Sequence, residues 1–292
     1  MLNPNDPLCD KQHYPDGLRP KGYILARLNP GAKKLATSIN VKLDGYMLIT
    51  KVSKIDTIEP SSRIILLHEI SQIDFGLTEK KWREWMNKLS KFTLVMYNMD
   101  VLAYTILKTY AVHMRHLFVP GTCVFTNDNR GENNLNWMSL FDELYQVRKR
   151  TLVLKSSLSN SGRGQLKTRS WKASHSYITN SINNCPSGVV ICQPLIPNFK
   201  EWKLPVVHYE IPTVVRQIYG DEVFRASVII MRAVLTCAKI KLPVLWRLDI
   251  VLSDGQYYLN EIETVSADYV FYGLDFVDIV SDTWASAARM PG

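Results

Sequence analysis

The stretch W-R-L-D-I-V-L-S-D-G-Q-Y-Y-L-N-E-I-E-T-V, residues 246–265, places three carboxylates on two strand-like runs around a turn signal. Side chains alternate between the two faces of a strand. Asp249 therefore shares a face with Arg247 in the first run, and Glu261 shares a face with Glu263 in the second. Carboxylates that gather on one face need a cation. A site for magnesium together with phosphate is the use that this pattern predicts.

The turn decides whether Asp249 joins the two glutamates, because a one-residue slip moves every side chain to the opposite face. A two-residue Asp254-Gly255 turn without a compensating bulge pairs Asp249 with Asn260 and turns the glutamates away. A three-residue loop that begins at Ser253 brings Asp249 to their face, and Gly255 suits the left-handed position before a bulge. The sequence leaves both turns open, and the magnesium site requires the three-residue loop.

A second segment, T-L-V-L-K-S-S-L-S-N-S-G-R-G at residues 151–164, is a candidate phosphate loop. A short strand-like run ends at Lys155 and is followed by serines, an asparagine and two glycines. Such a loop exposes backbone N–H groups and hydroxyls to anionic oxygens, and Lys155 can reach a phosphate as a point charge. The spacings of the Walker loop and of the G-x-G-x-x-G fingerprint are both absent.

Each segment also has an ordinary interpretation. Charged residues on a hairpin usually form a solvated face, and Arg247 with Glu261 would be a common cross-strand pair. A serine- and glycine-rich stretch is equally typical of a flexible surface loop. The phosphate interpretation therefore depends on the two segments occurring together.

Taken together, the two segments resemble the ATP-grasp superfamily. In that family a strand ending in lysine precedes a glycine-rich loop over the nucleotide phosphates, and a later strand meets the adenine. An Arg-x-Asp strand then pairs with a Glu-x-Asn strand that holds magnesium. The counterparts follow the same order here: Lys155, residues 156–164, V-V-I-C-Q-P-L-I at 189–196, Arg247-Leu248-Asp249 and Glu261-Ile262-Glu263.

The resemblance implies roles for residues around a nucleotide. Lys155 and the closing loop would contact the phosphates, Gln193 and Ile196 would flank the adenine, and Glu201 would hold the ribose hydroxyls. The residues assigned to the nucleotide in this way are Lys155, Ser159, Ser161, Gly162, Gly164, Gln193, Ile196 and Glu201.

The resemblance also implies a metal site. Asp249, Glu261 and Glu263 would hold magnesium, and Arg247 would steady an acyl phosphate or a transferring phosphate. Glu263 replaces the usual asparagine, which adds negative charge and keeps an oxygen ligand. The first lysine of the family has no clear counterpart, and Lys108 is the nearest candidate.

The activity implied by the resemblance is ADP-forming ligation of a carboxylate to an amine through an acyl phosphate, with ATP and Mg²⁺ as cofactors. The substrates would be small-molecule or peptide carboxylates and amines. Two alternatives stay open. One is a kinase of the same fold that phosphorylates an anionic small molecule, and the other is a non-catalytic module that binds nucleotide or nucleic acid.

The expected fold class is α+β, with two ATP-grasp subdomains that grip ATP and a small α/β domain before them. The expected boundaries are residues 1–100, 101–192 and 193–292. Strands are predicted over residues 46–49, 63–67 and 92–97. Helices are predicted over residues 78–91 with Thr78 as N-cap, 101–117, 173–183, 221–239 and 275–289.

Composition bounds the remaining choices. The chain has 292 residues, of which 46% are hydrophobic, so it can bury a full core. No apolar run approaches the ~20 residues that cross a bilayer, and five scattered cysteines without a C-x-x-C pair favour a reducing cytoplasm. The oligomeric state is undetermined, with a homodimer considered.

The net charge of +8 indicates anionic partners such as nucleotides or phosphorylated substrates. The densest basic run, R-G-Q-L-K-T-R-S-W-K at residues 163–172, also carries Trp171, which could stack on a base. No nucleic-acid-binding module accompanies this run. Nucleic acid is therefore not the expected partner.

Overall fold

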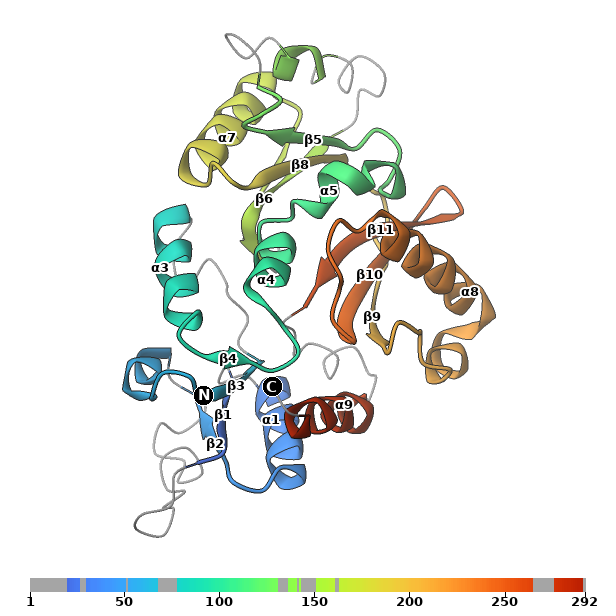
Figure 1. Cartoon of the computed structure of the whole chain (residues 1–292). Helices are drawn as coiled ribbons and strands as arrows, with labels where there is room; N and C mark the ends of the chain where they lie inside the picture. Colours follow the sequence, from blue (N-terminus) through green and yellow to red (C-terminus); the bar gives the residue numbers. More distant parts are fainter. Residues whose placement is uncertain are drawn as a thin grey trace.

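The computed structural model describes residues 20–26, 30–50, 52–67, 78–130, 136–140, 142, 151–160, 163–264 and 276–290. Within this part of the chain, the strands form three sheets, and each sheet carries helices on its surface (Figure 1). One sheet is parallel and the other two are antiparallel. The predicted α+β class is confirmed.

The first sheet is parallel and has the order β2-β1-β3-β4. Helices separate most of its strands along the chain, because parallel neighbours need crossover connections. The elements are β1 (Gly22–Ala26), α1 (Pro30–Lys42), β2 (Tyr46–Ile49), the 3-10 helix η2 (Val52–Thr57), β3 (Arg63–Leu67), α3 (Glu79–Leu89) and β4 (Thr93–Leu94). The strand predicted over residues 92–97 is too long, since Met96 adopts a φ of +74° that ends extended pairing.

Helix α3 forms as its sequence predicts. The Thr78 side chain accepts a hydrogen bond from the Lys81 N–H at its N-terminus, which satisfies one of the unpaired donors there. Trp82 and Trp85 are buried in the core. These tryptophans therefore contribute to the core.

The second sheet is antiparallel, with the order β5-β8-β6-β7 and helix α7 against it. Its elements are β5 (Cys123–Thr126), β6 (Leu152–Asn160), β7 (Arg163–Thr168), α7 (Trp171–Asn184) and β8 (Val189–Pro194). The segment predicted as a strand followed by an open loop is a hairpin instead. Strand β6 continues through the serines to Asn160, and β7 returns beside it.

The third sheet has the order β11-β10-β9 and carries α8 on one face (Figure 1). Its elements are β9 (Glu201–Val207), α8 (Val214–Cys237), β10 (Leu245–Ser253) and β11 (Gln256–Glu263). The helix predicted over residues 221–239 is confirmed from its predicted start to Cys237, and a further helical segment precedes it from Val214. Two helical segments meet at Gly220, whose φ of +88° interrupts the helical backbone.

Helices α4 (Met99–Ile106) and α5 (Tyr110–Met114) and the 3-10 helix η3 (Arg115–Leu117) follow the first sheet. The sequence predicted a single helix over residues 101–117. The structure divides it at Lys108, which adopts a left-handed φ of +55°. This break is uncommon for a residue with a side chain, and it places Lys108 near the acidic hairpin.

The last helix, α9 (Val277–Arg289), packs against α1 beside the first sheet (Figure 1). The Ser38 hydroxyl donates to the Ser281 hydroxyl oxygen at 3.0 Å, and the Lys42 ammonium lies 2.6 Å from the Asp282 carboxylate. Across the described ranges, no helix combines the length and the hydropathy that a membrane crossing requires.

Candidate active site

The acidic hairpin of β10 and β11 closes with a two-residue turn. Asp254 and Gly255 adopt φ values of +51° and +77°, as a type I′ hairpin turn requires, and Ser253 pairs with Gln256. The prediction that the acidic cluster requires a three-residue loop is therefore wrong. A β-bulge farther along the hairpin takes over its role.

The bulge lies at Asn260. Ile250 pairs with Leu259, and the next paired residues are Asp249 and Glu261, so Asn260 is an extra residue on β11. A bulge of this kind re-aims the side chains beside it. Without it, the two-residue turn would pair Asp249 with Asn260 and turn Glu261 toward the core.

The bulge brings three carboxylates together. Asp249 lies opposite Glu261, and Arg247 lies opposite Glu263. Ligand oxygens of Asp249, Glu261 and Glu263 all lie within 4.8 Å of one another. The predicted acidic cluster thus forms, and its geometry suits a cation that prefers oxygen ligands.

Cationic side chains contact every acid of this cluster. The Arg247 guanidinium holds Asp249 through two hydrogen bonds, with Nε 2.7 Å from Oδ1 and Nη2 2.8 Å from Oδ2. The same Nη2 lies 2.8 Å from the Glu263 carboxylate, and the Lys108 ammonium lies 2.6 Å from that of Glu261. Arg247 and Asp249 have 0% and 1% of their side-chain surfaces exposed, so this pair is a buried salt bridge.

The electrostatics of the acids differ from one position to the next. Burial alone would raise the pKa of Glu261, but the cations Lys108, Lys155 and Arg247, Lys108 foremost, together outweigh it and lower this pKa to about 2. Burial raises the pKa of Asp249 against the opposing effect of Arg247. Burial, followed by the Asp249 charge, raises the pKa of Glu201. Glu261 is therefore held in its charged form more firmly than Asp249 or Glu201.

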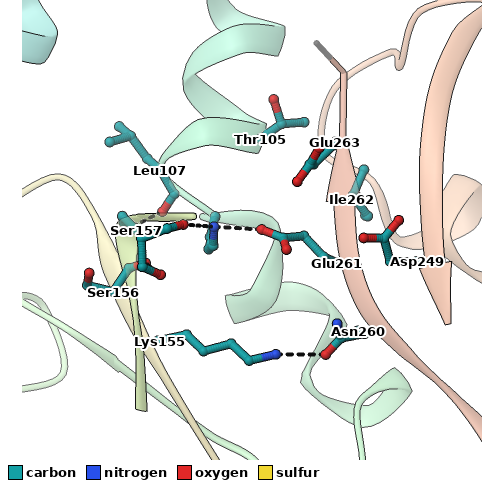
Figure 2. A network of polar contacts seen from close by, with 12 residues as sticks. Thr105, Leu107, Lys155, Ser156, Ser157, Asp249, Asn260, Glu261, Ile262 and Glu263 are labelled. Atoms are coloured by element: carbon teal, nitrogen blue, oxygen red, sulfur yellow. Dashed lines mark hydrogen bonds and ion pairs between the residues drawn. The ribbon is translucent and has the colours of Figure 1, made fainter. Parts of the chain in front are cut away.

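The hairpin of β6 and β7 faces the acidic hairpin. The Lys155 ammonium donates to the Asn260 side-chain oxygen at 2.7 Å (Figure 2). Burial lowers the pKa of Lys155, and the Glu261 charge opposes that change. The Lys108 ammonium also donates to the Ser159 carbonyl oxygen at 3.1 Å, so two lysines connect the hairpins.

The predicted loop residues have mixed outcomes. The Ser159 hydroxyl is buried and donates to the Ser156 carbonyl oxygen at 2.5 Å. Gly164 adopts a φ of +69°, and its carbonyl oxygen accepts a hydrogen bond from Tyr177. Ser161 and Gly162 lie outside the described residues. Contact between this hairpin and phosphate remains a prediction.

A cavity of about 390 Å³ lies between the second and third sheets. Its lining comes from both hairpins, from β8 and β9, and from the segment between these two strands. The lining residues are Val153, Lys155, Gln165, Lys167, Gln193, Pro194, Leu195, Ile196, Phe199, Glu201, Lys203, Asn260, Glu261 and Glu263. Arg247 and Asp249 are not in the lining and support it from behind.

One polar group in the cavity wall points to a ligand. The Gln193 side chain is 4% exposed, and its Nε2 has no hydrogen-bond partner among the described residues. A buried amide donor normally has a partner. A bound molecule with an acceptor atom would supply it here.

Comparison with known proteins defines the fold. No protein-family model matches the sequence, and no curated protein matches it either. Solved structures do match over nearly the whole chain. D-cycloserine synthetase DcsG is 13% identical with a TM-score of 0.66, and the match covers 92% of this chain and all of that one.

Two further neighbours were solved with nucleotide ligands. A D-alanine–D-alanine ligase from Bacillus anthracis, complexed with ATP, is 14% identical with a TM-score of 0.51, covering 92% of this chain and 98% of that chain. The ATP-grasp ligase PsnB, complexed with precursor peptide PsnA2 and AMPPNP, is 12% identical with a TM-score of 0.52, covering 93% and 99%. The chain has the ATP-grasp fold. The resemblance inferred from the two sequence segments is confirmed at the level of the fold.

Two residues of this ATP-grasp chain were missed by the sequence analysis. Lys203 pairs with Asp249 across β9 and β10 and lines the cavity. Burial would lower the pKa of Lys203, but the carboxylates, Asp249 foremost, raise it above the usual lysine range. Strand alternation from Glu201 would have identified Lys203. Asn260 was named only as a pairing partner in one turn, because nothing in the sequence marked the bulge.

The residues present fit a magnesium ion. The cluster offers carboxylate oxygens from Asp249, Glu261 and Glu263 and no sulfur or imidazole ligand, and this donor set is the one that magnesium prefers. The cavity beside the cluster is in the range of small-molecule sites. The arrangement can therefore hold a divalent cation beside a small-molecule cavity that Lys155 also lines.

Proposed function

We propose that the protein is an ATP- and magnesium-dependent ligase that joins a carboxylate to an amine and releases ADP and phosphate. The observation that carries this proposal is the cluster of three carboxylates within 4.8 Å of one another, set beside a cavity of about 390 Å³. On an ATP-grasp fold, this combination supports nucleotide binding at the cavity.

The nucleotide would lie along the cavity, with its base near residues 193–196 and its phosphates near the acidic cluster. Gln193 in β8 and Ile196 just after this strand line the cavity and would contact the adenine. Glu201 at the start of β9 also lines it and would contact the ribose hydroxyls. Lys155 would contact the phosphates from β6. Its contact with Asn260 at 2.7 Å holds the ammonium on the acid side of the cavity.

The metal would lie among Asp249, Glu261 and Glu263. A magnesium ion held by these acids would supply positive charge that offsets the negative charge on the phosphoryl oxygens. Arg247 and Lys108 hold the same acids in place, with distances of 2.6 to 2.8 Å between charged atoms. These contacts fix the positions of the acids before the nucleotide arrives.

The chemistry needs positioning and charge rather than a covalent nucleophile. An oxygen of the substrate carboxylate attacks the γ-phosphorus, the bond to the β,γ-bridging oxygen breaks, and ADP leaves. The amine nitrogen then attacks the acyl carbon, phosphate leaves, and the nitrogen loses its extra proton to solvent. Lys203 and Lys155 would offset the charge of the phosphoryl oxygens, because both ammonium groups belong to cavity-lining residues.

The named activities of the neighbours support amino-acid or peptide substrates. A D-alanine–D-alanine ligase and a ligase bound to a precursor peptide share this fold. The basic charge of the chain also suits an anionic carboxylate substrate. We therefore propose a small-molecule or peptide carboxylate as the phosphoryl acceptor.

Trapping of the acyl phosphate tests the proposal. The protein is incubated with Mg·ATP, hydroxylamine and a panel of amino acids and short peptides, and both ADP and hydroxamate are measured. We expect ADP release that depends on a carboxylate and matches hydroxamate formation. Asp249→Asn should lose both products, whereas Asp254→Asn, the same change at the turn of the same hairpin, should keep them.

Two outcomes would contradict the ligase. A stable phosphate ester without hydroxamate would show a kinase of this fold. No ADP with any carboxylate, and no rise in melting temperature with Mg·ATP, would favour a non-catalytic module. Melting temperatures of both variants separate lost chemistry from lost folding.

A further inference from the structure

Asn260 occupies an unusual place in the acidic hairpin. It is the extra residue of the β-bulge, between the Ile250–Leu259 pair and the Asp249–Glu261 pair. It is 6% exposed, although asparagine is depleted in strands. A buried amide at a bulge needs polar partners, and two of them lie across the cavity wall.

Those partners carry opposite charges. The Asn260 Oδ1 accepts a hydrogen bond from the Lys155 ammonium at 2.7 Å, and its Nδ2 donates to the Glu201 Oε1. An ammonium can only donate and a carboxylate can only accept, whereas a carboxamide does both. Asparagine thus connects the cation to the acid, and all three residues line the cavity.

The bulge lets this bridge and a metal-site acid share one face. Leu259 and Glu261 are two residues apart and would share the core face in a regular strand, but the extra residue turns Glu261 to the site face beside Asn260 (Figure 2). Figure 2 shows Asn260 and Glu261 both directed toward the lysine side of the cavity, where Lys155 lies. The hairpin therefore supplies a bridging amide without displacing a metal-site acid.

We propose that Asn260 is a positioning residue that fixes Lys155 and Glu201 relative to each other and thereby sets the preference of the cavity for a ribonucleotide. This inference rests on the proposed function, in which Lys155 contacts phosphate and Glu201 contacts ribose. The amide engages Glu201 at Oε1, which orients Oε2 toward a sugar hydroxyl. It also holds the Lys155 ammonium where this group would contact the phosphates.

Substitution should therefore affect two ends of the nucleotide at once. Asn260→Leu removes both hydrogen bonds at similar volume. Asn260→Asp keeps the acceptor for Lys155 but places a carboxylate against Glu201. If Asn260 only stabilised the hairpin, its substitution would change the melting temperature and leave the selectivity for the sugar unchanged.

The test is calorimetric titration of the full chain with Mg·AMPPNP and with its 2′-deoxy counterpart. We expect the unaltered protein to bind the ribonucleotide about tenfold more tightly, the effect of one hydrogen bond to a charged group. Asn260→Leu should weaken Mg·AMPPNP binding by about tenfold and reduce the sugar preference to about twofold or less. Asn260→Asp should lose the sugar preference as well.

Asn87→Leu is the matched control, since Asn87 is exposed on α3 far from the cavity, and it should keep both affinities. A full sugar preference in Asn260→Leu and Asn260→Asp, with normal melting temperatures, would overturn the positioning role while leaving the proposed function intact. No binding of Mg·AMPPNP by the unaltered protein would contradict both. If Asn260→Leu does not fold, the isosteric Asn260→Asp decides.

Discussion

The two hairpins that face each other across the cavity differ in how deeply their charged side chains are buried. The β10–β11 hairpin carries its functional charges inside the fold, where Arg247 and Asp249 are almost completely buried. The β6–β7 hairpin carries Lys155 on a half-buried wall, and its buried Ser157 and Ser159 hydroxyls donate to backbone carbonyl oxygens.

The difference indicates that the charged side chains of the β10–β11 hairpin stabilise the fold as well as form the site. In the β6–β7 hairpin, the charge of Lys155 serves the site alone. In the acidic hairpin each charge balances a buried neighbour, so its removal should cost stability as well as function. In the facing hairpin, Lys155 lines the cavity, and within the described residues its ammonium donates a hydrogen bond to Asn260, so its loss should affect ligand binding alone.

The largest expected effect is on the buried pair. Arg247→Met leaves the Asp249 carboxylate buried without its two hydrogen bonds, and breaking a buried pair costs about 3–5 kcal/mol. Urea unfolding should show a loss of that size in the free energy of unfolding. A loss below about 1 kcal/mol would break the comparison, because the acidic hairpin would then not depend on its charges.

Lys155→Met supplies the contrasting case. It removes one charge-assisted contact to phosphate, so nucleotide affinity should fall about tenfold to a hundredfold. The free energy of unfolding should change by less than about 1 kcal/mol, as for substitutions outside the core. Calorimetry with AMPPNP and urea unfolding measure the two effects. Equal losses in both would remove the distinction between the hairpins.

The Lys108–Glu261 ion pair predicts a dependence on pH. Burial would raise the pKa of Glu261, but Lys108 foremost, with Lys155 and Arg247, lowers it from 4.5 to about 2. A lowered folded-state pKa contributes stability above about pH 4.5, and this stability is lost as the pH falls toward 2. Lys108→Met should therefore move the midpoint of acid unfolding to higher pH.

Lys88→Met is the control for that shift, because Lys88 forms an exposed ion pair with Asp56 at 2.7 Å. Exposed pairs contribute little, and its acid-unfolding midpoint should stay with that of the unaltered protein. Equal midpoints for Lys108→Met and Lys88→Met would contradict the assigned role of the buried pair.

The smallest expected effect concerns the turn of the acidic hairpin. Gly255 has a φ of +77°, with open space where a side chain would project. Gly255→Ala therefore adds backbone strain without a clash, which costs about 1 kcal/mol. Thermal unfolding should show a small decrease in melting temperature with normal nucleotide affinity. A large loss of affinity would mean that the turn, rather than the bulge, sets the register of the acids.

The sequence was sufficient for the fold and for the identity of the acids. Thr78 marked the start of α3, and the order of Lys155 and the acidic motifs identified the ATP-grasp fold. The Asp254-Gly255 pair is itself a strong signal for a two-residue turn. The sequence left both turns open, and the magnesium site required the three-residue loop only in the absence of a bulge such as the one at Asn260.

The sequence could not predict contacts between segments that are far apart along the chain. A bulge depends on how both strands pack, and the left-handed backbone at Lys108 depends on its tertiary contacts with Glu261 and Ser159. Strand alternation fixes the face of a side chain. It does not determine which element lies across from that face, so the bridge from Lys155 through Asn260 required the structure.

The central claim is that Asp249, Glu261 and Glu263 form a magnesium site for a bound nucleotide. The most direct measurement is the affinity for AMPPNP with and without Mg²⁺, in the unaltered protein and in Glu261→Gln, with Glu84→Gln on the exposed side of α3 as control. We expect Mg²⁺ to tighten binding about tenfold or more in the unaltered protein and the control, and to have little effect in Glu261→Gln. An equal effect of Mg²⁺ in all three proteins, or none in the unaltered protein, would contradict the claim.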